Sequence, residues 1–328
     1  MRTAESRRIV AAVLISLCFM GGVAKVASAA GMAFLLFPEL AALSYDVFLR
    51  PRGTWARAPW MLALSPAVTA ALGVLVTRYL PYSAVSIAIC IVGAMVILKF
   101  MRSPIVPAVS ACVLALSLEE KSWLYPLAIL LGTGALAVLS SAYRRLFDQG
   151  ATHLARSAAD RVDDELESLP KQFLWVPFFV VFLGATYLLS MATGMRMVFF
   201  PPLVVIAFEM FAHAEVCPWA QRPVLLPAVC TLAAAAGVAA LAAFGPGVTS
   251  AVLAMLFGVV TLRVTRLHTI PALAIGLLPQ VTTRADWHFP LAVGIGSALL
   301  TTCFLIFKKF SGHRAHFPQS LRPSSCPE

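Results

Sequence analysis

The sequence contains few charged side chains. Asp, Glu, Lys and Arg make up 12% of its 328 residues, whereas apolar residues make up 60%. A soluble domain usually carries about 25% charged and about 45–50% apolar residues. The shortage of charge therefore excludes an ordinary soluble protein and favours a chain embedded in a lipid bilayer. Apolar segments fill most of the length and leave no room for a soluble catalytic domain.

Motifs of metal centres and of common enzymes are also absent. The seven cysteines show no paired-Cys or Cys/His spacing and lie mostly in apolar runs, so we interpret them as small hydrophobic residues. There is no GxSxG, HExxH or Walker A motif. We therefore expect no catalytic residue, no metal site and no cofactor. A membrane-embedded transferase is the one enzyme class left open, because such enzymes carry sparse motifs.

Twelve apolar segments follow one another along the chain. They lie at 9–30, 32–49, 58–79, 83–98, 104–117, 122–142, 173–190, 195–212, 223–244, 248–262, 269–282 and 287–307. A full crossing needs about 20 residues, so we expect 104–117 and 269–282 to be short, tilted or re-entrant helices packed against protein. The fold class predicted is all-α, a polytopic helical membrane protein with about 10–12 membrane segments.

The basic residues behind the net charge of +10 are distributed unevenly between the two predicted sides of the membrane. If all twelve segments cross and the N-terminus is cytoplasmic, the outer side receives only Lys25, Arg78, Lys121, Arg196 and Arg284, and the other twenty of the 25 basic residues lie inside. The positive-inside rule favours this arrangement. We therefore expect a multi-pass protein with both termini in the cytoplasm and no nucleic-acid partner. The Ala-rich, Arg-over-Lys usage is typical of a bacterial inner membrane.

The N-terminal segment has two interpretations. Arg7 and Arg8 before an apolar run that ends in Ala27-Ser28-Ala29 are also typical of a cleaved signal peptide. A similar segment recurs in the middle of the chain, where a signal peptide has no place. The recurrence favours a membrane helix.

The two halves of the chain resemble each other at an offset of 163 or 164 positions. Gly31-Met32 matches Gly194-Met195, and Trp123 matches Trp287. We interpret this as a tandem duplication into membrane units 8–147 and 172–310, and hence two homologous bundles. Six apolar segments per unit make the repeat parallel, whereas five would make it inverted, which the distribution of basic residues disfavours.

Two segments lie outside the repeated units. Residues 148–171 form a charged stretch in which apolar residues recur at helical spacing, and we interpret it as a cytoplasmic linker. Residues 311–328, rich in Ser, Pro and His, are expected to be a disordered cytoplasmic tail.

Three motifs recur in the same order in both halves. They are Phe37–Ala41 and Phe200–Val204, Trp55–Pro59 and Trp219–Pro223, and Arg102–Ala108 and Arg266–Ala272. This order resembles the HPP family of membrane proteins, in which a Phe-Pro-Ser-Leu-Gly segment and a Pro-Arg-rich loop precede Leu-His-Pro-Pro-Ala-Gly-Ala. Here His268 stands in one copy only, and the adjacent prolines are missing. The resemblance implies transport, and because a plant member carries nitrite in chloroplasts, it implies a small inorganic anion such as nitrite as solute.

Basic residues gather where a long apolar segment meets a short one that contains proline. The residues concerned are Lys99, Arg102, Arg263, Arg266 and His268, with Pro107 and Pro271 opening the short segments. A helix that restarts at such a break presents unbonded N–H groups and the positive end of its dipole to an anion. Interrupted helices of this kind recur in secondary transporters. The alternative is that these are ordinary loop charges that obey topology.

Three carboxylates stand within or near the ends of apolar segments. Asp46 and Glu209 match across the repeat, while Glu39 follows Pro38 within an apolar run. Carboxylates at membrane depth are costly, so we treat all three as candidates for proton coupling. The alternative for Glu39 is a structural ion pair with a neighbouring Arg or Lys.

The function predicted is transport of a small, anionic solute by alternating access between the two repeated bundles. The alternative is a non-transport scaffold or sensor that binds a partner through the 148–171 linker. The lipid bilayer is the partner that composition itself requires, and the sequence does not indicate an oligomeric state.

Overall fold

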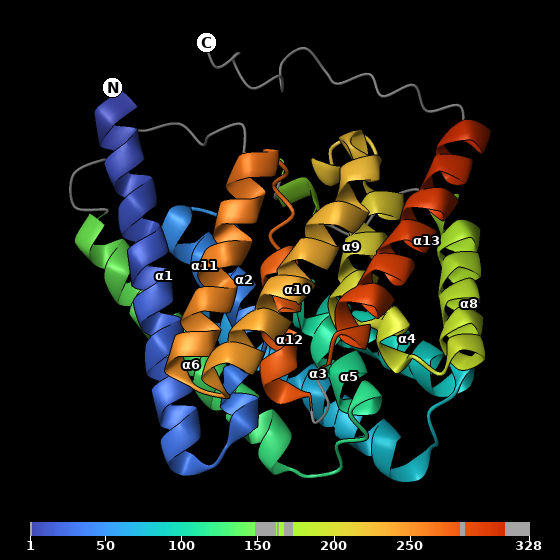
Figure 1. Cartoon of the computed structure of the whole chain (residues 1–328), viewed down its shortest axis with the longest axis horizontal. Helices are drawn as coiled ribbons and strands as arrows, with labels where there is room; N and C mark the ends of the chain where they lie inside the picture. The colour runs from blue at the N-terminus through green and yellow to red at the C-terminus, as the bar shows by residue number, and fades with distance from the viewer. Residues whose placement is uncertain (1, 148–161, 163, 167–172, 283–285, 312–328) are drawn as a thin grey trace.

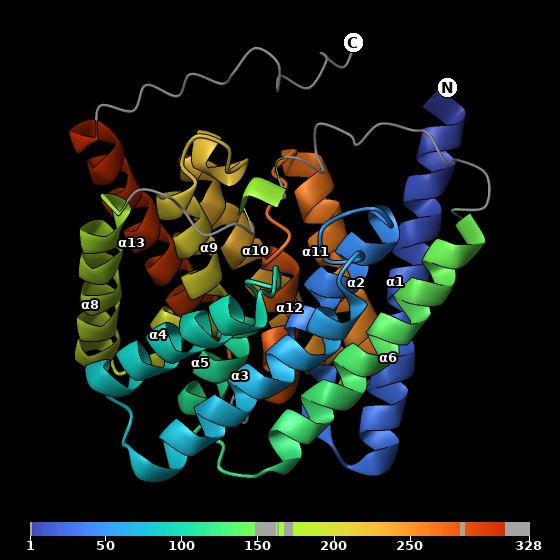
Figure 2. The same ribbon diagram turned by 180° about the vertical axis from the view of Figure 1, so that it is seen from behind.

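The computed structural model describes residues 2–147, 162, 164–166, 173–282 and 286–311. Over these ranges the chain is built of helices and contains no strand (Figures 1 and 2). The predicted all-α class is thus confirmed. Most of the predicted linker, 148–171, and the predicted tail from residue 312 onward lie outside the described residues.

Within the described residues, eight helical segments are long and apolar enough to cross a bilayer. The long helices are α1 (Arg2–Ala30), α3 (Pro59–Tyr79), α4 (Ala84–Met101), α6 (Leu124–Phe147), α8 (Trp175–Thr193), α10 (Leu226–Phe244), α11 (Val248–Thr265) and α13 (His288–Phe310). Their outward faces carry large apolar side chains such as Val92, Val181 and Phe257. An apolar outer surface of this extent fits lipid rather than water. The protein is an integral, multi-pass membrane protein.

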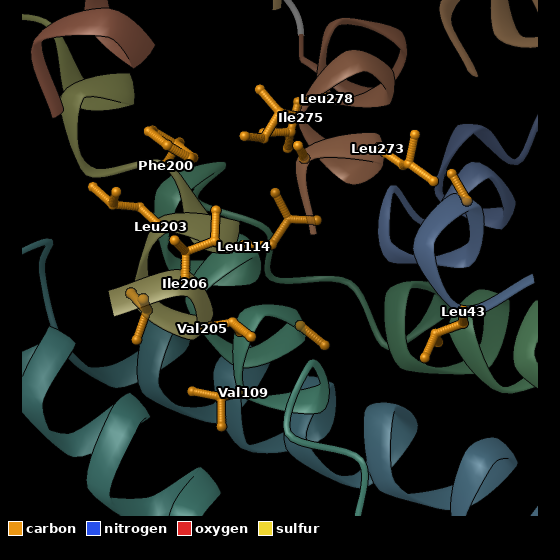
Figure 3. Close-up of a cluster of buried hydrophobic side chains, with 14 of the residues drawn as sticks. Leu43, Val109, Leu114, Phe200, Leu203, Val205, Ile206, Leu273, Ile275 and Leu278 are labelled. Atoms are coloured by element: carbon orange, nitrogen blue, oxygen red, sulfur yellow. The ribbon is translucent and has the colours of Figure 1, made fainter. Parts of the chain in front are cut away.

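Four short helices lie inside this shell. They are α2 (Glu39–Leu49), α5 (Ala108–Ser117), α9 (Pro201–Ala212) and α12 (Ala272–Val281). Each is about 15–18 Å long, roughly half the apolar thickness of a bilayer. Every residue of α5 and α12 is buried, as is all of α2 and α9 except the last residue. Apolar side chains from all four helices belong to one buried cluster, with Leu43 on α2, Val109 on α5, Ile206 on α9 and Ile275 on α12 among them (Figure 3).

The segments predicted at 104–117 and 269–282 are short helices, as expected. The segments at 32–49 and 195–212, predicted as single runs, are each divided. The chain turns at Gly31 and Gly194, whose φ values of 63° and 68° are left-handed. One 3₁₀ turn follows, η1 (Ala33–Leu36) or η3 (Arg196–Phe199), before a proline starts α2 or α9. Proline favours a new helix start because it has no N–H to leave unbonded.

The order of elements is the same in both halves. A long helix, a 3₁₀ turn and a short helix are followed by two long helices, a short one and a final long one. The second half adds two 3₁₀ turns before α10, η4 (Trp219–Gln221) and η5 (Pro223–Leu225). Helices α1 and α8, the first helices of the two halves, begin on the same side of the molecule, as in a parallel repeat (Figures 1 and 2).

Repeated glycines hold the interrupted segments against the long helices. A Cβ added at Gly73 on α3 would meet the backbone of α5, and one at Gly237 on α10 would meet the carbonyl of Gly276 on α12. Gly296 on α13 approaches the backbone of η3 in the same way, and Gly132 on α6 lies close to η1 and to the Leu40 side chain. A side chain at positions 73, 237 or 296 would displace backbone, so glycine is required at these three positions for packing.

Helices from the two halves also pack against each other. Helix α1 of the first half lies along α11 of the second, α2 contacts α12, and α5 contacts α9. The short helices therefore contribute to the interface between halves as well as to their own halves. This interface positions the candidate site.

Candidate functional site

A cavity of about 290 Å³ lies between the two halves beside the break that separates α4 from α5. Its walls come from α4, the connection to α5 and the start of α5 in the first half, and from α8 and α9 in the second. The lining residues are Ile91, Met95, Leu98, Lys99, Arg102, Ser103, Pro104, Val106, Val109, Phe179, Val204, Val205 and Phe208. Two of the predicted site residues, Lys99 and Arg102, are among them.

Lys99 and Arg102 are exposed at the mouth of the cavity. Arg102 ends α4 in a left-handed conformation with φ of 50°, and its N–H donates to the carbonyls of Leu98 and Lys99. Two cations in the last turn also complement the negative end of the α4 dipole. Helix α4 thus gives both side chains a local structural role and places their charges next to the cavity.

The backbone at the helix breaks differs from the sequence prediction. At α5, the N–H groups of Ala108, Val109 and Ser110 donate to the carbonyls of the residues three positions earlier. At α12, Ala272, Leu273 and Ala274 do the same. These 3₁₀-type bonds satisfy the amides that an α-helix leaves open. The breaks opened by Pro107 and Pro271 therefore offer no free first-turn amides at these positions to an anion.

The basic residues of the second half do not line the cavity. Arg263 is exposed and donates to the hydroxyl of Tyr45 on α2 at 3.3 Å. Arg266 is exposed and ends α11 with φ of 52°, the same left-handed geometry as Arg102. The five predicted basic residues thus divide into one pair at the cavity and three on the side where α1 and α2 pack.

His268 is exposed in the connection between α11 and α12. Partial desolvation, followed by the positive charges of Arg263 and Arg50, lowers the pKa of His268 below its ordinary value of 6.5. The imidazole is therefore mainly neutral at pH 7. A neutral ring adds no positive charge to an anion site, in contrast with the arginines.

Glu39 is as buried as the other two candidate carboxylates and is hydrogen-bonded to a hydroxyl group on another short helix. It is 3% exposed and stands in the first turn of α2, where its Oε1 accepts a hydrogen bond from the Ser110 hydroxyl in the first turn of α5. Its Oε2 has no hydrogen-bond partner among the described residues. In the second half, Pro202 and Ala274 replace Glu39 and Ser110, so both members of the pair are missing together.

The hydrogen-bond partner of Glu39 is adjacent in the chain to a residue of the cavity wall. Ser110, to which it is bonded, directly follows Val109, a lining residue on α5. Two helix N-termini, those of α2 and α5, contribute this buried polar pair. The positive ends of the two dipoles stabilise a negative charge at this point.

Asp46 and Glu209 occupy a different environment. Both are 3% exposed, near the ends of α2 and α9. Asp46 is paired with Arg50 one turn later, and the Arg50 Nε donates to its Oδ1 at 2.8 Å. In the second half His213 occupies the position of Arg50, one turn after Glu209. Asp46 is therefore engaged in a structural ion pair with Arg50, which the sequence analysis did not anticipate for this residue.

Sequence reasoning missed most of the cavity. Phe179, Val204, Val205 and Phe208 belong to the second half but face basic residues of the first. Each of these four lies in an apolar run, and nothing in its spacing distinguishes it from a core residue. The only sequence signal at the cavity is the basic pair before Pro104 and Pro107.

No protein-family model matches the chain, and neither a curated protein nor a solved structure is detectably similar to it. The resemblance to the HPP family therefore depends on the motifs alone. The candidate site likewise depends on the geometry described above.

Proposed function

We propose that this protein transports a small anionic solute across the membrane and that the solute enters the cavity between α4, α8 and α9. The observation that carries the proposal is the cavity itself, which lies between the two halves and has Lys99 and Arg102 at its mouth. Fixed positive charge at the entrance of a low-dielectric pocket attracts anions. The four buried half-length helices support the proposal, because interrupted helices surround the solute in many secondary transporters.

The packing also supports a location for the conformational change. Helix α1 lies along α11, whereas the cavity separates the corresponding helices, α8 and α4, which make little direct contact. Helices that already enclose a hollow can close on a solute with less loss of packing than helices in full contact. We therefore place the alternating-access movement at α4 and α8.

Glu39 is the proposed proton carrier. It is buried, has one unbonded carboxylate oxygen within the described structure and contacts α5 beside the cavity wall. Intramembrane carboxylates of this kind mark proton pathways in many pumps and transporters. Asp46 is a weaker choice, because its charge is already paired with Arg50.

We also propose that the chain is a duplicated, divergent HPP protein of a bacterial inner membrane, with both termini in the cytoplasm. The motif order supports the family, and the distribution of Lys and Arg supports the orientation. A reporter fused to either terminus should be active only when it lies in the cytoplasm. Activity on the opposite side would contradict the orientation without affecting the proposed site.

Transport can be tested with purified protein in sealed vesicles. Labelled nitrite, formate and acetate are added outside, and the initial uptake rate is compared with that of protein-free vesicles. Replacing both Lys99 and Arg102 by Gln should lower the rate about tenfold, since each removes a charge that attracts the anion. The matched control replaces Arg263 and Arg266 by Gln. Uptake equal to that of protein-free vesicles would refute transport of these anions, and equal rates in the two variants would remove Lys99 and Arg102 from the mechanism.

The proton pathway needs a separate measurement. In the same vesicles, an inward proton gradient should accelerate uptake by the native protein, and Glu39→Gln should abolish that acceleration while leaving exchange of solute intact. Glu209→Gln is the comparison variant, because Glu209 is the equally buried candidate at the end of α9. Loss of the acceleration in Glu209→Gln but not in Glu39→Gln would assign the carrier role to Glu209. An unchanged gradient dependence in Glu39→Gln would exclude the carrier role.

The scaffold alternative depends on the linker, and the described part of the linker contacts its own chain. Asp164 pairs with Arg57 and accepts a hydrogen bond from Thr54, both in the connection between α2 and α3. Leu166 is buried against the molecule. These contacts leave the described linker residues engaged within the protein, so they favour the carrier over the scaffold.

A further inference from the structure

The lining of the cavity is strongly divided between apolar and basic groups. Its walls are formed by aliphatic, methionine, proline and phenylalanine side chains, and the lining residues include Lys99 and Arg102 but no acidic residue. Ser103 is the remaining polar residue. Its hydroxyl oxygen accepts hydrogen bonds from the Ser65 hydroxyl at 2.6 Å and from the Ile105 N–H at 3.2 Å, and its own O–H can still donate one. The charge of the lining is therefore concentrated at Lys99 and Arg102.

Such a lining fits an amphiphile better than a bare inorganic ion. An ion that moved past the mouth would lose water and meet apolar walls, which cannot replace its hydrogen bonds. A ligand with an acidic head and a hydrocarbon tail avoids this cost. Its head can pair with Lys99 and Arg102 at the mouth while the tail removes apolar surface from water inside the cavity.

The size of the cavity limits the length of the tail. A volume of about 290 Å³ holds roughly ten groups of the size of a water molecule or a methylene. This accommodates one carboxylate and a single chain of about eight carbons. The two long acyl chains of a phospholipid exceed this volume.

The matching break between α11 and α12 has different neighbours. There α1 packs along α11, and Arg263 is directed to the Tyr45 hydroxyl on α2. The outer faces of α4 and α8 carry exposed residues such as Val92, Val96 and Val181, so the cavity lies behind a lipid-facing surface. A ligand that dissolves in the bilayer edge therefore has a short route to the mouth.

We infer that the cavity binds a single-chain carboxylate of about eight carbons, with the carboxylate at Lys99 and Arg102 and the chain along α4, α8 and α9. As a statement about what is transported, this rests on the proposed function. As a statement about binding, it depends only on the cavity and its charges.

Binding is tested with radiolabelled octanoate and the full-length protein in phosphatidylcholine nanodiscs, using equilibrium dialysis with empty nanodiscs to subtract partitioning into lipid. We expect saturable binding at one site per chain. Unlabelled acetate should compete far more weakly, because each methylene buried adds about fourfold in affinity. Neutral 1-octanol should compete about tenfold more weakly than octanoate, because it lacks the charge-assisted contact.

Matched variants locate the ligand. Arg102→Gln should weaken octanoate binding about tenfold, whereas Arg266→Gln, at a position with the same left-handed backbone but no cavity, should leave it unchanged. Met95→Trp should fill the cavity and abolish binding, whereas Val96→Trp on the lipid-facing side of α4 should not. Absence of saturable binding, or equal effects of the two arginine variants, would overturn the inference.

Two further arms separate the sources of the ligand and the two proposals. If adding phosphatidylglycerol to the nanodiscs displaces octanoate in a manner that requires Arg102, the occupant is a membrane lipid and the inference is wrong. If octanoate fails to bind while nitrite uptake into vesicles persists, the inference fails and the transport proposal stands. If octanoate binds but vesicles containing the protein take up no octanoate, nitrite, formate or acetate, the binding site stands and the transport of these anions fails.

Discussion

Beside the break between α4 and α5 lies a cavity, whereas beside the corresponding break between α11 and α12 helix α1 packs directly against α11. Both breaks end in an arginine with a left-handed φ, and both restart with the same set of 3₁₀-type bonds. The backbone of the repeat is therefore alike in the two places. The difference arises from the long helices that flank the breaks, α8 in one case and α1 in the other.

The buried faces of these two helices also carry different side chains. The buried face of α1 carries Ala12 and Ser16, and the Ser16 hydroxyl reaches the Ser44 carbonyl on α2 at 3.3 Å. At the same positions of the repeat, α8 carries Trp175 and Phe179. Both aromatic rings pack on Phe208 of α9, with ring centroids 5.4 and 6.4 Å apart. Small residues thus let α1 approach its neighbours, and aromatic residues hold α8 against α9.

Two copies of one repeated framework can thus surround matching helix breaks differently. The break between α4 and α5 lies beside a cavity, and the break between α11 and α12 lies beside packed helices. Small residues let two helix backbones approach each other closely, whereas large residues keep the helix axes farther apart. Both places lie at the interface between the two halves: the side with α4 and α8 contains the cavity, and the side with α1 and α11 is in direct helix contact.

The largest effect is expected from Ser16→Phe, which places the aromatic residue of α8 on α1. Ser16 is fully buried between α1 and α2, so a phenyl ring there forces the helices apart and removes two hydrogen bonds. The free energy of unfolding should fall by about 3 kcal/mol. Reversible unfolding of the purified protein in mixed micelles measures this change. Cys18→Phe, on the exposed face of the same helix, should have little effect, and equal losses would break the comparison.

A smaller difference in the free energy of unfolding is expected between alanine variants of Leu98 and Leu262. These two leucines occupy matching positions on α4 and α11. Both are 8% exposed, but only Leu98 lines the cavity. Leu262→Ala should cost about 3 kcal/mol because it empties a packed site, and Leu98→Ala about 2 kcal/mol because part of its surface already faces a hollow. Unfolding of both variants under one set of conditions gives the difference. A larger loss for Leu98→Ala would mean that the cavity is filled in the working protein.

Much of the fold follows from the sequence. The apolar segments predict the long helices, and the shortness of 104–117 and 269–282 predicts α5 and α12. The division of 32–49 and 195–212 was not predicted. Hydropathy is continuous through Pro38 and Pro201, so an apolar run conceals the point where helix geometry changes. Glycine before each run, at positions 31 and 194, is the signal that could have indicated a turn.

The candidate site was predictable only in part. Lys99 and Arg102 stand out because charges before a proline-containing segment are rare in an apolar chain. Their similarity to Arg263 and Arg266 gave no indication that the two pairs have different surroundings. That difference depends on which helix of the other half lies alongside, and periodicity reports that a face is apolar without identifying its neighbour. The Glu39–Ser110 pair is likewise a long-range contact that spacing does not reveal.

The smallest expected change in stability is a pH dependence that comes from His268, near the contact between α1 and α11. Because the pKa of His268 is lowered in the folded protein, the neutral ring is favoured there, whereas the unfolded chain takes up a proton near pH 6.5. The contribution to stability is therefore fully present above pH 6.5 and is lost as the pH falls from 6.5 toward the lowered value. Exposure of the ring to solvent screens this effect, so the change in stability should be smaller than that caused by either substitution above.

Unfolding measured from pH 7.5 to 5 should show a weaker pH dependence in His268→Gln than in the native protein. The control, His288→Gln, removes an exposed imidazole that contacts Asp286 beyond the end of α12, and it should leave the contribution of His268 to the pH dependence in place. An identical pH dependence of the native protein and His268→Gln would show that His268 has the same pKa in the folded and unfolded chains.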